Sequence, residues 1–476
     1  MTFTPTEEQQ AIIDAAVSSD RNLLVSALAG AAKTSTLVLL AQALPDVRTL
    51  CLAFNKKIAT EMQERLPPNC TAMTLNSLGH RMWGDTLGRR LKLDTSKNFN
   101  IISDLISRLP AEYRKIAGEN FSDYTKLLGD AKTAGLVPDN YGRSAKPLLS
   151  EHEFFASTEW ILEDWEEELI VNALRRSIDE SFQGVIDFDD QLLMPAVFPS
   201  PVPRYPLILV DEAQDLSLIN HRMLKRLTVK RLIAVGDECQ AIYGFRGASE
   251  NSMTLMETEF KMLRLTLSVT FRCPVAIVEH AQWRAPHMKW GPTAPVGEVR
   301  SLTHWNMDSI PEEAAIICRN NAPLFSLAIR MLSQGRYAQI VGNDIGKGLM
   351  KIMKKFGDGT TPQLDVLKAI DRWETEKLLK ARSPGPIKDR AACMRIFARQ
   401  GKTLGDAIAY AEHIFESSGP VKLMTGHKSK GLEFDNVFIL DEHLLANEGQ
   451  DRNLRYVMQT RAKQSLTYIT SEGLEE

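Results

Sequence analysis

A short apolar run that ends in a small-residue loop and a lysine restricts this chain to few folds. Residues 22–30 (NLLVSALAG) are apolar and finish in small side chains, and residues 31–44 (AAKTSTLVLLAQAL) continue with helical spacing. The pattern predicts a buried strand, a tight loop and a helix. The loop is close to the phosphate-binding consensus G-x-x-x-x-G-K-[ST]. Alanine stands at both glycine positions, so the four consensus positions read Ala27, Ala32, Lys33 and Thr34.

An acidic pair follows another apolar run. Residues 206–215 read PLILVDEAQD, so Asp211 and Glu212 come directly after a buried strand, where carboxylates are costly unless they hold a cation or take a proton. Beside the loop, Asp211 is expected to hold Mg²⁺ together with Thr34, and Glu212 to orient and deprotonate the attacking water. The alternative for an isolated pair is an acidic turn that caps the next helix. The combination with Lys33 favours hydrolysis of ATP or GTP.

Further apolar runs predict the architecture around this loop. Residues 48–55 and 231–238 are short and apolar between polar turns, which is typical of buried parallel strands and predicts a doubly wound α/β core. Residues 85–183 and 346–418 are instead charged and mostly helical in spacing. We expect them to be two helical insertions.

Composition excludes several classes of protein. The chain has 476 residues, which is enough for two to four domains, and its formal net charge of -3 neither requires nor excludes a polyanionic partner. Its six cysteines contain no CxxC pair, which argues against a zinc site or a secreted disulfide framework. The polar start (MTFTPTEEQQ) and the lack of any run of 18 apolar residues predict a soluble cytoplasmic protein without a membrane segment.

Residues 236–248 (GDECQAIYGFRGA) resemble the third motif of superfamily 1 DNA helicases of the UvrD/Rep group, whose usual form is GD-x-x-Q-[SA]-I-Y-x-[FW]-RGA. Other stretches resemble the motifs of that group in the same order along the chain. They are 3–13 (FTPTEEQQAII), 53–62 (AFNKKIATEM), 74–81 (TLNSLGHR), 188–193 (FDDQLL), 267–274 (LSVTFRCP), 424–439 (MTGHKSKGLEFDNVFI) and 454–463 (LRYVMQTRAK).

The resemblance implies an α/β fold with two RecA-like parallel-sheet P-loop domains and helical insertions. The first RecA-like, ATP-binding domain is predicted at 1–84 and 184–263, with a helical insertion subdomain at 85–183. The second RecA-like domain is predicted at 264–345 and 419–476, with a reduced helical insertion subdomain at 346–418. A motor of this kind holds ATP between its two domains, so that hydrolysis changes the angle between them.

The resemblance also implies a set of residues around ATP and Mg²⁺. The catalytic set is Lys33, Asp211, Glu212, Gln240, Arg272 and Arg461, in which Gln240 senses the γ-phosphate and both arginines stabilise charge in the transition state. Thr34 and Asp211 are the implied metal ligands. The implied ATP-binding set is Gln9, Ala29, Gly30, Ala31, Ala32, Lys33, Thr34, Ser35, Phe271 and Glu433, where Gln9 reads adenine, Phe271 stacks on it and Glu433 meets the ribose.

Single-stranded DNA is the implied track, because a sequence-independent grip combines aromatic platforms with backbone donors and cations. The implied DNA-binding residues are Phe54, Asn55, Thr74, Asn76, Tyr243, Phe245, Arg246, Thr425 and His427. Tyr243 and Phe245 have the alternative of being core aromatics at a strand end. The residues themselves do not exclude RNA as the track.

The sequence departs from the group's pattern at four places. Ala32 is expected to keep ordinary α or β geometry and to add a methyl group near the phosphates, which predicts an active but weaker ATPase. Asn76 replaces a histidine and loses a ring for stacking, and Phe271 replaces the more usual tyrosine. The insertion at 346–418 is shorter than in full-length relatives.

Two functions follow from these features. The first is an ATP-dependent single-stranded DNA translocase and 3′-5′ DNA helicase that also meets junctions of single- and double-stranded DNA, with a protein partner contacting the helical insertions. The second is a nucleotide-gated module that binds DNA ends or junctions with little unwinding, in a phage replication or antiviral defence complex. The altered loop and the reduced insertion are the features that keep the second function open as the alternative, whereas a metabolic kinase explains neither the second α/β core nor GFRGA.

Overall fold

The computed structural model describes residues 5–142, 144–244, 251–342 and 344–475. They divide into two compact units, each with its own parallel sheet. The first unit comprises the chain up to Leu28, Ala32–Thr158 and Leu162–Ser268, and the second comprises Ala29–Ala31, Glu159–Ile161 and the chain from Val269 onward. Both units are α/β, which confirms the predicted fold class. Within the described ranges, no helix is long and apolar enough to span a bilayer.

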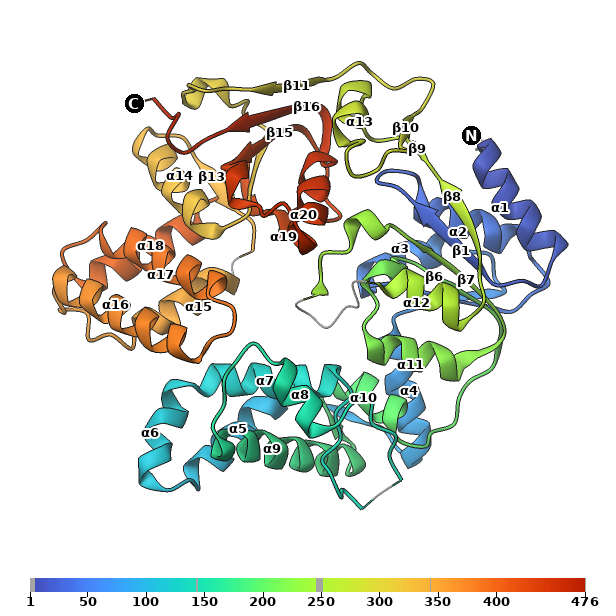
Figure 1. Cartoon of the computed structure of the whole chain (residues 1–476), viewed down its shortest axis with the longest axis horizontal. Coiled ribbons are helices and arrows are strands. Elements are labelled where there is room, and N and C mark those ends of the chain that lie inside the picture. The colour runs from blue at the N-terminus through green and yellow to red at the C-terminus, as the bar shows by residue number, and fades with distance from the viewer. Residues whose placement is uncertain (1–4, 143, 245–250, 343, 476) are drawn as a thin grey trace. The chain divides into compact units, whose positions relative to one another are not determined.

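The first unit contains a six-stranded parallel sheet of order β3-β2-β6-β7-β1-β8. Its strands are β1 (Leu23–Ala27), β2 (Thr49–Leu52), β3 (Cys70–Met73), β6 (Tyr205–Val210), β7 (Thr228–Gly236) and β8 (Leu263–Leu267). The interior strands β1, β2 and β6 are almost wholly buried, which accounts for their apolar sequences. Helix α1 (Glu7–Ser18) precedes the first strand, and the strands are connected by helices that include α2 (Lys33–Ala43), α3 (Lys56–Arg65), α11 (Leu218–Leu227) and α12 (Ser252–Glu259) (Figure 1).

Strand β8 corrects one predicted boundary. The sequence predicts that residue 264 begins the second domain, but Leu263–Leu267 pairs in parallel with β1 at the edge of the first sheet. The backbone N–H of Leu28 extends this pairing by donating to the carbonyl of Leu267 (3.0 Å). A short apolar run predicts a strand but does not encode which strand it pairs with, so the boundary could not be placed from sequence. The first sheet therefore ends at Leu267.

The stretch from α4 to the start of β6 is mostly helical, and its buried side chains belong to the apolar core of the first unit. It contains α4 (Leu75–Leu87), α5 (Lys97–Ser107), α6 (Ala111–Glu119), α7 (Phe121–Thr133), α8 (Glu151–Ser157), α9 (Asp164–Phe182) and α10 (Asp190–Val197), with β4 (Lys92–Leu93) paired to β5 (Val185–Ile186). Ile102 and Leu174 of these helices belong to the same buried cluster as Leu50 and Val210 of the sheet. The insertion and the sheet therefore share one continuous apolar core, which runs between them through α4 and α10.

The carboxyl of Asp189, just before α10, is expected to make the free energy of unfolding depend on pH. Burial, followed by the neighbouring charge of Asp187, raises the pKa of its carboxyl from 3.8 to about 7. Because the folded state holds this proton more tightly than the unfolded chain, stability falls as pH rises from about 4 through about 7 and is then constant. We expect Asp189→Asn to raise the melting temperature by roughly 5 °C at pH 8 and by little at pH 4.5. Calorimetry at both pH values checks this, and an equal change at both would contradict it.

The second unit contains a six-stranded parallel sheet of order β11-β16-β15-β12-β14-β13. Its strands are β11 (Glu298–Ser301), β12 (Ala314–Cys318), β13 (Ala338–Ile340), β14 (Val421–Thr425), β15 (Phe434–Leu440) and β16 (Ala462–Ile469), and β9 (Val269–Thr270) pairs separately with β10 (Lys289–Trp290). The helices around the sheet are α13 (Val275–Ala281), α14 (Asn321–Ser333), α19 (Gly426–Ser429) and α20 (Gly449–Gln459). This unit therefore repeats the parallel architecture of the first.

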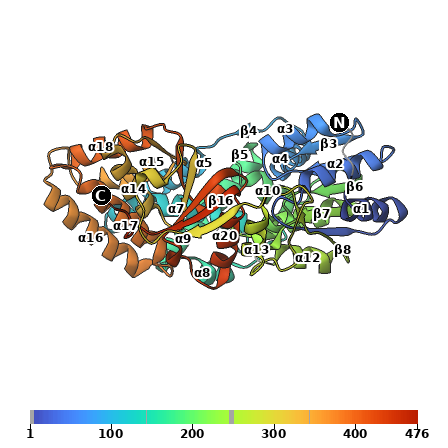
Figure 2. The same ribbon diagram turned by 90° about the horizontal axis from the view of Figure 1, so that it is seen from above.

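Four helices lie between β13 and β14 of the second unit. They are α15 (Asp344–Met353), α16 (Gln363–Lys380), α17 (Gly385–Ala398) and α18 (Leu404–Glu416), and both views show them as one group (Figures 1 and 2). Asp389 of α17 joins this group to α14, because its carboxylate accepts the N–H groups of Asn321 and Ala322 at the start of that helix (3.1 Å each). The aromatic rings of Phe325 and Phe397 continue the contact (5.5 Å between centroids).

Candidate functional site

The loop between β1 and α2 contains a backbone conformation that the sequence analysis did not expect. Ala32, the residue before α2, has φ 56° and ψ 41°, in the left-handed region, and Gly30 has φ 73°. The expectation of ordinary geometry at Ala32 is therefore wrong. The chain must reverse from strand to helix within a few residues, and the turn uses the conformation that glycine adopts freely. A Cβ atom in this region costs about 1 to 2 kcal/mol, so the alanine is strained.

We expect Ala32→Gly to stabilise the protein by about 0.5 to 1 kcal/mol. Glycine removes the strain of roughly 1 to 2 kcal/mol but adds roughly 0.4 to 1 kcal/mol of chain entropy to the unfolded state. Ala31 is the matched control, because it is buried and is not among the described residues with positive φ, so Ala31→Gly should destabilise. Urea unfolding of the three proteins measures both changes, and the same sign for both variants would contradict the strain.

Two carboxylates face this loop from the end of β6. The hydroxyl of Thr34 donates to Oδ2 of Asp211 (2.9 Å), and Lys33 Nζ lies 3.9 Å from Oε1 of Glu212. Asp211 is buried, and its backbone N–H donates to the carbonyl of Leu52 (2.9 Å), which fixes it beside β2. Glu212 has φ 52°, so a second strained residue lies opposite Ala32. The structure thus brings together the four side chains that the sequence predicted for phosphate and metal.

The raised pKa of the Asp211 carboxyl is what a carboxylate that holds a cation would show when the cation is absent. Burial, and then the charge of Glu212, raises the pKa of Asp211 to about 7. A divalent cation beside this carboxylate would remove the penalty for the charged form. The Thr34 hydroxyl and the Asp211 carboxylate are hard oxygen donors of the kind that Mg²⁺ takes, with water and phosphate oxygens completing its shell. These two residues therefore fit a magnesium ion.

Gln214 is a residue that the sequence analysis missed. Its Nε2 donates to Oε2 of Glu212 (2.5 Å), and its Oε1 accepts the backbone N–H of Asp237 (2.8 Å). Asp237 in turn accepts a hydrogen bond from Nε2 of Gln240, the predicted γ-phosphate sensor. Gln214 thus links the acidic pair to the turn after β7, and all of these side chains except Glu212 are buried. The signal was its place in DEAQD, where the sequence analysis used only the acidic pair.

Gln9 and Ser35 are engaged within the protein. Gln9 closes a capping box at the start of α1, with Oε1 accepting the N–H of Thr6 (3.0 Å), while its Nε2 donates to the hydroxyl of Thr36 (3.1 Å). A contact with adenine would have to replace one of these bonds. Ser35 accepts a hydrogen bond from Arg65 (3.0 Å).

In the second unit, the predicted ATP-contacting residues gather where β15 and β16 begin. Arg272 Nε lies 2.7 Å from Oε2 of Glu433, one residue before β15. Arg461, one residue before β16, is only 1% exposed and donates to the carbonyls of Val457 (2.8 Å) and Leu432 (3.1 Å). Phe271, beside Arg272, is 53% exposed. The arginines and the glutamate thus form one cluster in this unit.

Thr425 and His427 lie elsewhere in the same unit. Thr425 ends β14 and is buried, and His427 is half-buried in α19, which follows at once. They therefore lie at the carboxyl end of a strand of this sheet, whereas the arginine cluster lies at the amino ends of β15 and β16.

The strand-contacting residues predicted in the first unit share one edge of its sheet. Asn55 and Thr74 cap α3 and α4, accepting N–H groups from Ile58 (2.9 Å) and Ser77 (3.1 Å), just after β2 and β3 end. Because carboxyl ends of parallel strands meet at one edge, these helix starts lie on the same side of the sheet as the phosphate loop. Phe54 is 45% exposed, and its ring stacks on Tyr243 (6.0 Å between centroids, 7° between planes). Phe245 and Arg246 lie outside the described residues.

Phe188 is an aromatic residue that was not among the predicted DNA-binding residues. The residue is 55% exposed, and its carbonyl accepts a hydrogen bond from Nδ2 of Asn76 (2.7 Å). Asn76 is one of the predicted strand contacts, so an exposed ring lies beside it. The motif FDDQLL contains the phenylalanine, but alternation of apolar and acidic residues does not reveal which side chain is exposed.

Two parallel sheets, with a lysine-threonine loop facing an acidic pair in the first of them, define a P-loop protein with two RecA-like domains. Residues 6–261 match the UvrD/REP helicase N-terminal domain, and residues 420–469 match the UvrD-like helicase C-terminal domain. The chain belongs to the UvrD/REP helicase family, as the resemblance of its motifs predicted.

Individual relatives are similar at low identity. F-box DNA helicase 1 of Gallus gallus is 25% identical over 512 residues, which cover 99% of this chain and 49% of the relative. F-box DNA helicase protein 1 of Schizosaccharomyces pombe is 24% identical over 97% of this chain and 57% of its own length. ATP-dependent DNA helicase PcrA of Leuconostoc citreum is 26% identical over 64% of this chain and 43% of its own length. The chain thus spans about half the length of these curated relatives.

Proposed function

We propose that this chain is an ATP-dependent motor that moves along single-stranded DNA with 3′-5′ polarity and separates duplex strands ahead of it. The observation that carries the proposal is the contact of Thr34 with Asp211, with Lys33 beside Glu212. Lys33 would neutralise the transferred phosphate, and Glu212 would accept the proton of the attacking water. Magnesium, when bound by Thr34 and Asp211, neutralises charge on the β- and γ-phosphates.

The second unit would complete the nucleotide site from the other side of ATP. In this proposal, Arg272 and Arg461 stabilise charge that develops on the γ-phosphate, Phe271 stacks on adenine and Glu433 meets the ribose. The ion pair of Arg272 with Glu433 supports it, because the guanidinium is held in place yet partly exposed. Gln9 and the backbone of Ala29–Ala31 would hold the base and the phosphates, and Gln240 would respond to the γ-phosphate. Closure of two units on one nucleotide makes hydrolysis a mechanical step.

The DNA strand would run over exposed rings and helix starts. Phe54, Tyr243 and Phe188 supply rings in the first unit, and each stacked base contributes about 1 to 3 kcal/mol. Helix starts at Asn55 and Thr74 offer backbone N–H groups to phosphates. The remaining contacts that we propose are Asn76, Phe245, Arg246, Thr425 and His427.

One observation favours the nucleotide-gated binding module as a second function. Ala32 puts a methyl group and backbone strain into the loop that must approach the phosphates. Slow turnover with tight, nucleotide-dependent DNA binding would follow if this loop closes poorly on ATP.

ATP turnover and strand displacement separate the two functions. Turnover is measured with and without single-stranded DNA, and displacement is measured on matched duplexes with a 3′ or a 5′ single-stranded tail. A motor predicts turnover that DNA stimulates strongly and displacement from the 3′-tailed duplex only. Tight binding with negligible turnover would select the gated module. Displacement from the 5′ tail would contradict the polarity, and equal stimulation by an RNA oligonucleotide would contradict DNA as the preferred track.

A further inference from the structure

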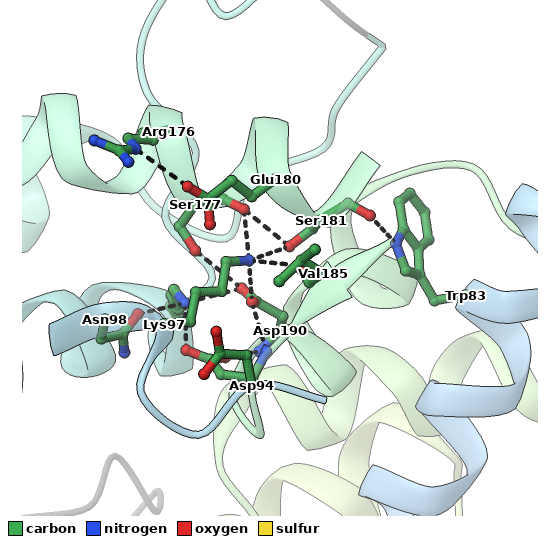
Figure 3. A network of polar contacts seen from close by, with 12 residues as sticks. Trp83, Asp94, Lys97, Asn98, Arg176, Ser177, Glu180, Ser181, Val185 and Asp190 are labelled. Atoms are coloured by element: carbon green, nitrogen blue, oxygen red, sulfur yellow. Dashed lines mark hydrogen bonds and ion pairs between the residues drawn. The ribbon is translucent and has the colours of Figure 1, made fainter. Parts of the chain in front are cut away.

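A cluster of buried charges lies between the first helical insertion and the turn that carries Phe188. Lys132 Nζ of α7 lies 2.6 Å from Oδ2 of Asp187 and 3.0 Å from Oδ1 of Asp190. Lys97 Nζ of α5 lies 2.6 Å from Oδ2 of Asp190 and donates to the carbonyl of Val185 (2.8 Å). The side chains of both lysines and of Asp190 are fully buried. Two cations from the insertion therefore hold two carboxylates of one turn. Figure 3 shows Lys97 beside Asp190.

The carboxylates also close the turn itself. The N–H of Asp187 donates to Oδ2 of Asp190 (3.0 Å), and the N–H of Asp190 donates to Oδ1 of Asp187 (2.8 Å). Phe188 lies between them, and Asn76 holds its carbonyl from α4 (2.7 Å). The backbone on both sides of Phe188 is thus fixed, while its ring stands in solvent.

The cluster continues into the helices around it. Lys97 also donates to the carbonyl of Ser177 and the hydroxyl of Ser181 on α9 (2.8 Å each), and the carbonyl of Ser181 accepts the indole N–H of Trp83 on α4 (2.9 Å) (Figure 3). The hydrogen bonds and ion pairs of this cluster therefore connect helices α4, α5, α7 and α9 to one turn.

Stability alone does not explain why charges are buried in this way. Buried ion pairs are often no more stabilising than apolar residues of the same size, and their best supported use is to specify one arrangement. The apolar core around the cluster is already extensive. The arrangement that this cluster specifies is the turn that carries Phe188. The exposed ring of Phe188 lies beside Asn76, one of the predicted DNA contacts.

We infer that Lys97 and Lys132 are positioning residues that fix the ring of Phe188 for stacking against a base of the DNA strand. Through them, the first helical insertion contributes to DNA binding. The inference rests on the proposed DNA-binding function. It assigns the insertion a role in strand binding through a turn of the RecA-like core.

The test uses the full chain and a single-stranded oligonucleotide that contains 2-aminopurine, whose fluorescence reports stacking. Phe188→Ala should weaken binding about 10-fold and lower the stacking signal, to which Phe54 and Tyr243 would still contribute. Lys132→Met should weaken binding several-fold with less than a two-fold change in the KM for ATP. In the Phe188→Ala background, Lys132→Met should add no further loss, because both act through the same ring. Lys126→Met, on the exposed face of the same helix, is the matched control and should bind as the unaltered protein does.

A second variant covers the case in which Lys132→Met does not fold. Lys132→Met with Asp187→Asn leaves Asp190 paired with Lys97, so no buried charge lacks a partner. This double variant should fold and still show the lowered stacking signal. If it folds and stacks as the unaltered protein does, or if losses from Phe188 and Lys132 add fully, the positioning role is wrong. If the unaltered protein does not bind single-stranded DNA, the proposed function fails, and the inference fails with it.

Discussion

Glu212→Gln is expected to lower the kcat of ATP hydrolysis about 1,000-fold while changing ATP affinity little. The carboxylate lies beside Lys33 and is oriented by Gln214, and glutamine keeps its shape but cannot accept the proton of water. Loss of a general base usually costs between about 100-fold and 10,000-fold in rate. Turnover by a coupled assay and binding of a fluorescent ATP analogue measure the two quantities.

Glu61→Gln provides the control for this variant. Glu61 lies on the exposed surface of α3, where it pairs only loosely with Lys57 (3.8 Å), so its substitution should leave turnover unchanged. A Glu212→Gln protein that hydrolyses ATP at the normal rate would show that another group takes the proton.

Arg272→Ala is expected to lower DNA-stimulated turnover about 1,000-fold. A guanidinium that stabilises the transferred phosphate typically contributes 1,000-fold or more in rate. Arg272→Lys should rescue poorly, because an ammonium cannot reproduce the planar donor pair. Steady-state kinetics with saturating single-stranded DNA measure both variants.

Arg300→Ala is the matched control from the second unit. Arg300 is an exposed arginine of β11 near Glu298 (3.6 Å), and its loss should have little effect. Normal turnover by Arg272→Ala would contradict the proposal that the second unit contributes to the nucleotide site.

The parts of the fold that the sequence predicts best are those that each segment encodes locally. The apolar runs of β1, β2 and β6, and the acidic pair after β6, are local patterns. The parallel pairing of both β1 and β6 with β7 then places Thr34 and Asp211 at the same edge of the sheet. The partner of β8 depends on the whole sheet, and the same short run is compatible with either domain.

Backbone conformation and hydrogen-bond partners were the less predictable part of the site. Alanine in the left-handed region at Ala32 contradicts residue preference, and only the reversal of the chain between β1 and α2 imposes it. Gln214 and Phe188 depend on contacts with Asp237 and Asn76, which are distant in sequence. The roles assigned to Arg461 and Gln9 stay predictions, since each side chain already has partners within the protein.

The continuous packing of the first insertion with its sheet has a consequence for how this protein can be taken apart. Ile102 and Leu174 lie in one apolar cluster with Trp83 of α4 and Leu193 of α10, so excising residues 85–183 would leave apolar residues of these two helices facing water. The first unit should accordingly lose hydrogen-exchange protection as one cooperative block, from the helices and the strands together. A trimmed chain obtained by deleting these helices would need new apolar-to-polar substitutions across the uncovered surface to avoid aggregation.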